Sequence, residues 1–280
     1  MTNHDGILID DTKGISFDNR GLYYGDALFE TIKVVNGKII FWEDHYFRLM
    51  SSMRILRMEI PMSFTMEFLE AEITRALTGN DLLDRSARVR LTVFRKAGGL
   101  YKPTTNDISF LISVQPLDEP FYILSEKPYE VDLYKDHFLA PGLLSNCKTN
   151  NRLVNVLGSI YAEENALQGC LLLNTDKHVV EGLSGNLFLR KGKLVKTPPL
   201  SDGPIKGVLR KQVLDLLATV EAYDVEETSI SPFELQKADE LFLTNVIGGI
   251  LPITKYRKKS YGHELAKQLL PRLNTKVRLG

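Results

Sequence analysis

The segment from Pro116 to Pro128 divides this chain into two halves. It contains three prolines, and its apolar residues follow neither the two-residue repeat of a strand nor the repeat of a helix. The chain has 280 residues, which exceeds the usual size of a single hydrophobic core. We therefore expect two lobes: a smaller α+β domain at residues 1–116, an interdomain loop at 117–128 and a larger domain at 129–280.

The first half shows the alternation of a sheet and the periodicity of helices. Two β-rich runs, 28–35 and 38–41, flank Asn36-Gly37, the residue pair that is typical of a two-residue hairpin turn. Apolar spacing predicts two helices and two further strands, at residues 42–57, 63–76, 87–95 and 108–114. In the second half, the predicted elements are a strand, a helix, a hairpin, a helix and a strand, at 129–138, 152–168, 186–195, 206–219 and 239–245.

The composition excludes several classes of partner. Lys plus Arg and Asp plus Glu each number 35, so no net charge attracts nucleic acid or an anionic membrane, and a small-molecule partner is expected. Two cysteines are too few for a disulfide framework, and the histidines show no metal-site spacing. No window approaches the ~18 uncharged apolar residues of a membrane helix, and no signal peptide is evident, so we expect a cytoplasmic protein.

Lys148 and Glu181 are the residues that most indicate chemistry. Lys148 lies among uncharged neighbours, where partial desolvation favours a reactive amine. A lysine amine can form a Schiff base with pyridoxal phosphate, and a buried carboxylate can keep the pyridine nitrogen of this cofactor protonated. The ordinary interpretations are a solvated surface lysine and a carboxylate that ends a strand, and the pattern leaves both open.

Arg48 and the segment Gly207-Val208-Leu209 are candidate phosphate ligands. Arg48 lies at the edge of the predicted 42–57 helix, either as a solvated residue or as a bidentate clamp on a phosphate. Gly207 to Leu209 open a predicted helix after a Pro-Ile-Lys turn, so their backbone N–H groups can bind an anion. Many helices begin in this way without a ligand.

The order of motifs along the chain resembles that of the class IV aminotransferases, pyridoxal phosphate enzymes with the D-amino-acid aminotransferase-like fold. The similarity spans nearly the whole chain and rests on Arg20 to Glu30, His45 to Leu49, Lys148, Glu181 to Asn186, Gly207 to Arg210 and Thr244 to Pro252. It implies a two-lobed α/β fold of the α+β type, with residues 129–280 as the cofactor-binding domain. It also implies a homodimer, because active sites in this family take residues from the neighbouring subunit.

The resemblance implies roles for individual residues. Lys148 is implied as the Schiff-base lysine and acid/base catalyst, and Glu181 as the partner of the pyridine nitrogen. The other implied cofactor contacts are Arg48, Val208, Leu209, Thr244 and Asn245. The implied substrate contacts are Tyr24, Glu30, Arg95 and Lys102.

Subfamily motifs favour a 4-amino-4-deoxychorismate lyase. The segment from Lys148 to Leu153 is similar to the lyase pattern Lys-x-x-Asn-Arg-Leu, whereas branched-chain aminotransferases usually have a tyrosine where Leu153 stands. Thr244 to Pro252 is similar to the lyase pattern Thr-Asn-Ser-x-x-Gly-Ile-x-Pro, although Val246 replaces its serine. Leu100 departs from the pattern, because some lyases have an arginine there, and Lys102 or Lys96 is the candidate replacement.

The expected reaction is therefore the elimination of pyruvate from 4-amino-4-deoxychorismate, a small-molecule amine, to give 4-aminobenzoate for folate synthesis. The alternative is a class IV aminotransferase that acts on branched-chain or D-amino acids with 2-oxoglutarate. A second alternative is a non-catalytic protein that binds pyridoxal phosphate.

Overall fold

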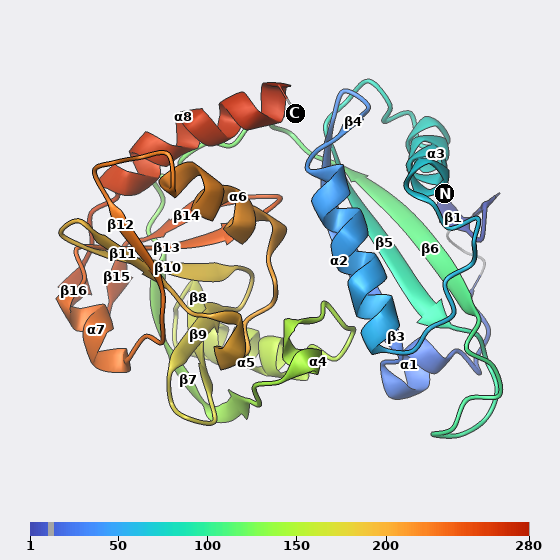
Figure 1. Ribbon diagram of the computed structural model, residues 1–280, viewed down its shortest axis with the longest axis horizontal. Coiled ribbons are helices and arrows are strands. Elements are labelled where there is room, and N and C mark those ends of the chain that lie inside the picture. Colours follow the sequence, from blue (N-terminus) through green and yellow to red (C-terminus); the bar gives the residue numbers. More distant parts are fainter. Residues whose placement is uncertain (11–13, 280) are drawn as a thin grey trace. The chain divides into compact units, whose positions relative to one another are not determined.

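The computed structural model describes residues 1–10 and 14–279, and these form two compact units (Figure 1). Unit 1 contains the described residues up to Pro120 together with Cys147–Asn151. Unit 2 contains Phe121–Asn146 and Arg152–Leu279. The division after Pro120 falls inside the predicted 117–128 loop. The short segment that carries Lys148 belongs to unit 1, whereas the sequence-based boundaries placed it in the larger domain.

Unit 1 is built on a six-stranded sheet with the strand order β2-β1-β6-β5-β3-β4, and its ladder pairings are antiparallel. The strands are β1 (Thr2–His4), β2 (Ile7–Ile9), β3 (Ala27–Val35), β4 (Lys38–Ile39), β5 (Ala87–Arg95) and β6 (Ile108–Pro116). The helices are α1 (Arg20–Tyr24), α2 (Trp42–Ile55) and α3 (Met66–Thr78). The predicted strands and helices between residues 28 and 114 are therefore confirmed, with ends that differ by a few residues.

The turn between β3 and β4 confirms the predicted hairpin. Asn36 and Gly37 both have positive φ angles, 49° and 77°, and Val35 pairs with Lys38 on either side of them. This backbone twist matches the twist of the strands, and asparagine and glycine tolerate it best. The hairpin leads directly into α2, so it fixes which face of the sheet that helix covers.

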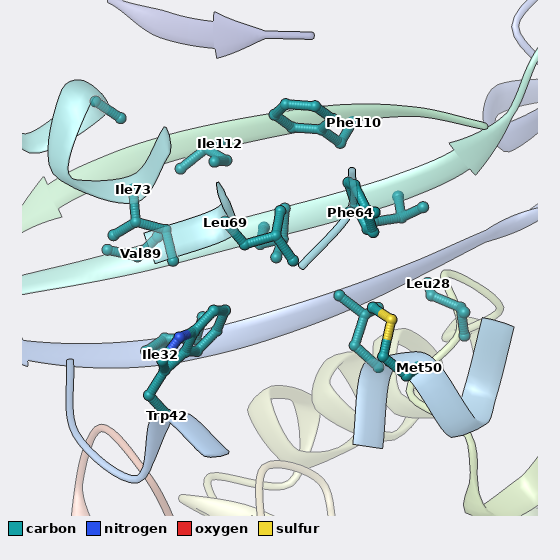
Figure 2. Packing of buried hydrophobic residues seen from close by; sticks show 14 of the residues in the cluster. Leu28, Ile32, Trp42, Met50, Phe64, Leu69, Ile73, Val89, Phe110 and Ile112 are labelled. Carbon is teal, nitrogen blue, oxygen red and sulfur yellow. The ribbon is translucent and has the colours of Figure 1, made fainter. Parts of the chain in front are cut away.

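Helices α2 and α3 cover one face of the sheet, and Figure 2 shows their side chains meeting those of the strands. Leu28 and Ile32 of β3 point into this core together with Val89 of β5. Because side chains alternate along a strand, Glu30 points to the same face as Leu28 and Ile32, whereas Phe29 points to the opposite face. This alternation places Glu30 on the side of the sheet that α2 covers and Phe29 on the opposite side.

Unit 2 is built on a ten-stranded sheet. Its main path is β12-β11-β10-β9-β8-β7-β15-β16, and β13 joins through β10 and carries β14. The strands are β7 (Glu130–Leu139), β8 (Gly169–Asn174), β9 (Val179–Gly182), β10 (Asn186–Lys191), β11 (Leu194–Thr197), β12 (Asp224–Glu227), β13 (Glu240–Asn245), β14 (Gly249–Ile253), β15 (Lys255–Tyr256) and β16 (Lys259–Ser260). The helices are α4 (Leu143–Asn146), α5 (Leu153–Glu164), α6 (Val208–Leu217), α7 (Pro232–Lys237) and α8 (Glu264–Leu279), with a 3₁₀ turn at Leu200–Asp202.

The elements predicted for unit 2 are present. The strands predicted at 129–138 and 239–245 are β7 and β13, the helices at 152–168 and 206–219 are α5 and α6, and the hairpin at 186–195 is β10 with β11. Helix α8 was not predicted. It contains Pro271, a residue that usually ends a helix, and it begins against the fully buried carboxylate of Glu240. That carboxylate accepts the N–H groups of Leu265 and Ala266 at 2.9 and 2.8 Å. Within residues 1–10 and 14–279, no helix is long and apolar enough to cross a membrane.

Candidate active site

Lys148 is held against the first half of β3 by main-chain hydrogen bonds. The Phe29 N–H donates to the Lys148 carbonyl at 2.8 Å, and the Asn150 N–H donates to the Ala27 carbonyl at 3.0 Å. The segment therefore extends the sheet of unit 1 at its edge. The half-buried Lys148 side chain places its Nζ atom 4.5 Å from the centre of the Phe29 ring. The amine is thus positioned by a sheet pairing rather than by a free loop.

Glu30, His45 and Arg48 form a buried polar cluster between β3 and α2. Arg48 donates from Nε to Glu30 Oε1 at 2.8 Å, and its Nη2 atom contacts Oε2. His45 Nδ1 lies 2.7 Å from the same Oε2 atom. Since His45 and Arg48 are three residues apart on α2, they share the helix face that meets the sheet. Glu30, which is 1% exposed, therefore orients the Arg48 guanidinium and is not itself available to a substrate.

The charges in this cluster follow from its contacts. Burial raises the pKa of Glu30, but the charge of Arg48 and the hydrogen bonds from His45 and Arg48 outweigh burial and lower the pKa from 4.5 to about 2. Burial lowers the pKa of His45 despite Glu30, and the nearby charges of Arg48 and Lys148 lower it further. A neutral His45 that donates from Nδ1 to Glu30 presents a lone pair at Nε2. That atom is buried and has no hydrogen-bond partner within the described part of the chain.

Glu181 lies in β9 of unit 2 and is buried, with 4% of its surface exposed. Its Oε2 atom accepts the Ile205 N–H at 3.0 Å and the Asn186 side-chain amide at 3.4 Å. Asn186 stands opposite Glu181 in the β9–β10 pairing, so the strand register brings the two side chains together. These neutral donors fix the position of a carboxylate that is buried deeply enough to pair with a cationic ring nitrogen.

The start of α6 and the end of β13 provide groups that suit a phosphate. Helix α6 begins after Gly207 without a side-chain cap, so the N–H groups of Val208 and Leu209 have no acceptor inside the helix. A side chain at Gly207 would collide with Asn186, which explains why glycine stands at this turn. Helix α6 packs on β13, where the Thr244 hydroxyl is buried and lacks a hydrogen-bond partner among the described residues. A phosphate would satisfy both kinds of donor.

We expect Thr244→Val to weaken binding of pyridoxal phosphate by about 10- to 100-fold, because one hydrogen bond to a charged oxygen is lost. Fluorescence or absorbance titration of the apoprotein would measure the dissociation constant. The matched control is Thr197→Val, since Thr197 is equally buried but its hydroxyl already donates to the Leu187 carbonyl at 2.7 Å. Equal affinity losses in the two variants would remove Thr244 from the cofactor site.

Several implied site residues are committed to other contacts. Asn245 accepts the N–H groups of Ile247 and Gly248 at 3.1 and 2.8 Å, so its side chain shapes the turn after β13. Arg95 donates from Nε to Asp26 and from Nη1 and Nη2 to Asn106 and the carbonyls of Leu56 and Arg57. These bonds hold the Arg95 guanidinium at the end of β5, and a substrate contact of Arg95 stays a prediction.

Tyr24 and Lys102 remain substrate candidates. Tyr24 is half-buried, and its ring centre lies 5.6 Å from that of Tyr101 and 4.9 Å from the Arg20 guanidinium. Arg20 is buried and donates to carbonyls of residues 98–101, so it holds the loop that carries the exposed Lys102. No cluster of three or more His, Cys, Asp or Glu residues that could hold a metal occurs in residues 1–10 and 14–279.

Arg90 is a functional candidate that the sequence-based prediction missed. Its guanidinium carbon lies 4.0 Å from the centre of the Phe29 ring, the same ring that Lys148 approaches. Its Nη2 atom donates to the Asn150 side chain at 3.3 Å, two residues from Lys148. The alternation of residues 87–95 places Arg90 on the face away from the core, and the sequence alone did not show that this face lies next to Lys148.

A family model described as Amino-transferase class IV matches residues 27–256. Over 284 residues, the chain is 30% identical to a Methanocaldococcus jannaschii protein that is provisionally named a branched-chain-amino-acid aminotransferase, covering 98% of this chain and 94% of that protein. It is also 27% identical over 243 residues to the aminodeoxychorismate lyase of Vibrio harveyi, covering 86% of each. These two relatives thus carry two different reaction names.

Solved structures confirm the expected fold class. The 4-amino-4-deoxychorismate lyase from Pseudomonas aeruginosa is similar with a TM-score of 0.82 and 27% identity, over 98% of both chains. The family model covers most of the sequence, and the two-sheet α/β fold agrees with the fold that the resemblance predicts. This chain belongs to the class IV aminotransferase family.

Proposed function

We propose that this chain is a pyridoxal phosphate-dependent lyase that converts 4-amino-4-deoxychorismate into 4-aminobenzoate and pyruvate. The observation that carries the proposal is the Lys148 segment, in which a half-buried amine lies over Phe29 and is followed by residues similar to the lyase pattern. Both asparagines after Thr149 have roles within unit 1, since Asn150 binds Arg90 and Asn151 donates to the Gly25 carbonyl at 3.3 Å. The relatives named as lyases support the same reaction.

We assign residues of this chain to the ring nitrogen and the phosphate of the cofactor. Glu181 would pair with the pyridine nitrogen, and the N–H groups of Val208 and Leu209 with the Thr244 hydroxyl would bind the phosphate. Arg48 remains a predicted phosphate ligand, oriented by its contacts with Glu30. When bound, pyridoxal phosphate supplies an electron sink next to the substrate amine.

Lys148 would carry out the proton transfers of the reaction. Its Nζ atom would take the proton from the ring carbon that bears the substrate amine. The bond between the ring and the enolpyruvyl oxygen then breaks, and the substrate ring becomes aromatic. Return of the proton to the terminal carbon of the enolpyruvyl group releases pyruvate, so that atoms balance without a second substrate. Because burial lowers the pKa of His45, this residue would stay neutral and would add no positive charge near Lys148.

The direct test is to incubate the cofactor-loaded protein with 4-amino-4-deoxychorismate and no keto acid. We expect 4-aminobenzoate and pyruvate in equal amounts, quantified by chromatography and a coupled pyruvate assay. A reaction that proceeds only when a keto acid is added would contradict the proposal, as would a protein that binds the cofactor and yields neither product.

The second candidate is an aminotransferase, which the M. jannaschii relative favours by its name. In that case an amino acid alone would convert the bound cofactor to its amine form, and 2-oxoglutarate would restore it. Absorbance spectroscopy with a panel of branched-chain and D-amino acids distinguishes this cycle from the lyase reaction, which needs no keto acid. Under either proposal, we expect the protein to be a homodimer in the cytoplasm.

A further inference from the structure

The loop at residues 203–207, between the 3₁₀ turn and α6, lies partly inside unit 2 although it has no regular structure. Its residues belong to no helix or strand, and Gly203 and Pro204 are buried. Buried backbone N–H and C=O groups need hydrogen-bond partners, and an irregular segment has no strand pairing or helical turn to supply them. The partners of this loop therefore come from side chains elsewhere in the unit.

Two asparagines of the sheet bind carbonyls in and beside this loop. The Asn174 side chain at the end of β8 donates to the Asp202 carbonyl at 3.1 Å, and the Asn186 side chain at the start of β10 donates to the Ile205 carbonyl at 2.9 Å. The Ile205 N–H donates to Glu181. The loop is therefore attached to the strands around the residue that we assign to the pyridine nitrogen.

A third asparagine, Asn146, binds the loop from the other end of the chain segment that it joins. Its Nδ2 atom donates to the Leu200 carbonyl at 2.9 Å and to the Pro204 carbonyl at 2.7 Å. Its own carbonyl accepts the Lys206 N–H at 3.2 Å. An amide group can donate two hydrogen bonds, so Asn146 uses both of its donors here. These bonds extend from the 3₁₀ turn to the residue before Gly207, and they fix where the first turn of α6 begins.

We propose that Asn146 is a positioning residue for the cofactor phosphate: it holds the loop so that the N–H groups of Val208 and Leu209 are aligned before the phosphate binds. The inference rests on the proposed cofactor site, since it takes these N–H groups as phosphate ligands. Donors that are fixed in advance bind a ligand more tightly, because less ordering is needed on binding. Asn146 is also the last residue of unit 2 before the segment that carries Lys148, so it ties the loop to the start of that segment.

The test compares two ligands that differ by the phosphate, pyridoxal phosphate and pyridoxal. Absorbance titration of the apoprotein would give both dissociation constants for wild type, Asn146→Ala and Asn146→Asp. We expect Asn146→Ala to weaken pyridoxal phosphate binding by about 10-fold or more and pyridoxal binding by less than about 2-fold, because Lys148 and Glu181 still bind the ring. Asn146→Asp keeps the size of the side chain but replaces both donors with an oxygen that faces two carbonyls, so its loss should be at least as large.

The matched control is Asn80→Ala in unit 1. Asn80 is half-buried like Asn146, and its Nδ2 atom likewise donates to two carbonyls, those of Met1 and Ala76, both at 2.8 Å. Removing its side chain breaks hydrogen bonds of the same kind at a position that we do not assign to the cofactor. The ratio of the two dissociation constants should therefore stay at the wild-type value in Asn80→Ala and change in Asn146→Ala.

Two results would overturn the inference: unchanged binding of pyridoxal phosphate in Asn146→Ala, or equal losses for pyridoxal phosphate and pyridoxal. The outcomes also separate this role from the proposed reaction. A selective loss of pyridoxal phosphate affinity in Asn146→Ala, while wild type forms no 4-aminobenzoate, would support the role of Asn146 and reject the lyase assignment. Lyase turnover by wild type, with normal cofactor binding in Asn146→Ala, would support the lyase and reject the role of Asn146.

Discussion

Replacing Lys148 with alanine is expected to abolish turnover and the visible absorbance of the lysine-bound cofactor. The rate should fall by on the order of 10⁴ or more, because one change removes both the amine that holds the cofactor and the proton-transfer group. The absorbance spectrum after loading with pyridoxal phosphate, and product formation from 4-amino-4-deoxychorismate, measure the two effects separately.

The matched control for this change is Lys193→Ala, which removes an exposed lysine from the turn between β10 and β11. That variant should keep both the spectrum and the activity. If Lys148→Ala behaved like Lys193→Ala, the assignment of the catalytic lysine would be wrong and so would the mechanism built on it.

The second large effect is expected from Glu30→Gln, which removes the charge from the centre of the buried cluster. Arg48 would keep its charge while its ion pair with Glu30 is broken, and breaking a buried ion pair by removing one partner costs about 3 kcal/mol or more. Chemical unfolding should therefore show a lower free energy of unfolding, and cofactor affinity should fall because the Arg48 guanidinium is no longer fixed. Glu43→Gln, at an exposed position near the start of α2, is the control and should change stability little.

The same carboxylate predicts a distinct dependence of stability on pH. The pKa of Glu30 is about 2 in the folded protein and 4.5 as its ordinary value, so the unfolded chain binds the proton first as pH falls. Its contribution, about 3 kcal/mol, is fully present above pH 4.5 and is lost between pH 4.5 and 2. Burial lowers the pKa of His45, so stability already begins to fall below its ordinary value of 6.5. Glu30→Gln should flatten the curve below pH 4.5, and an unchanged slope there would contradict this account.

Periodicity predicted the elements whose two faces differ in polarity. Residues 87–95 alternate clearly, and α2 has one apolar stripe, so both were found within a few residues. Helix α8 was missed because Pro271 opposes a helix locally, and its start depends on Glu240, which lies far away in the sequence. Tertiary contacts of this kind leave no local pattern.

Strand parity shows on which face of β5 each arginine lies. Lys148 and Glu181 were predicted from motifs, and Arg95 rather than Arg90 was predicted as a substrate contact. Residues 87, 89, 91, 93 and 95 share one face, so Arg95 points to the core side, where it binds Asp26. Arg90 has the opposite parity and lies over Phe29. His45 was not predicted as a site residue, because the sequence does not show that its side chain contacts Glu30.

The membership of Cys147–Asn151 in unit 1 has a consequence for how the protein is put together. The polypeptide passes from one unit to the other three times, after Pro120, after Asn146 and after Asn151. A fragment that ended at Pro120 would lack the partners of the Phe29 N–H and the Ala27 carbonyl and would expose an open sheet edge. No single cleavage point therefore yields two complete units, because the segment that carries Lys148 completes the sheet of unit 1 while the chain on both sides of it belongs to unit 2.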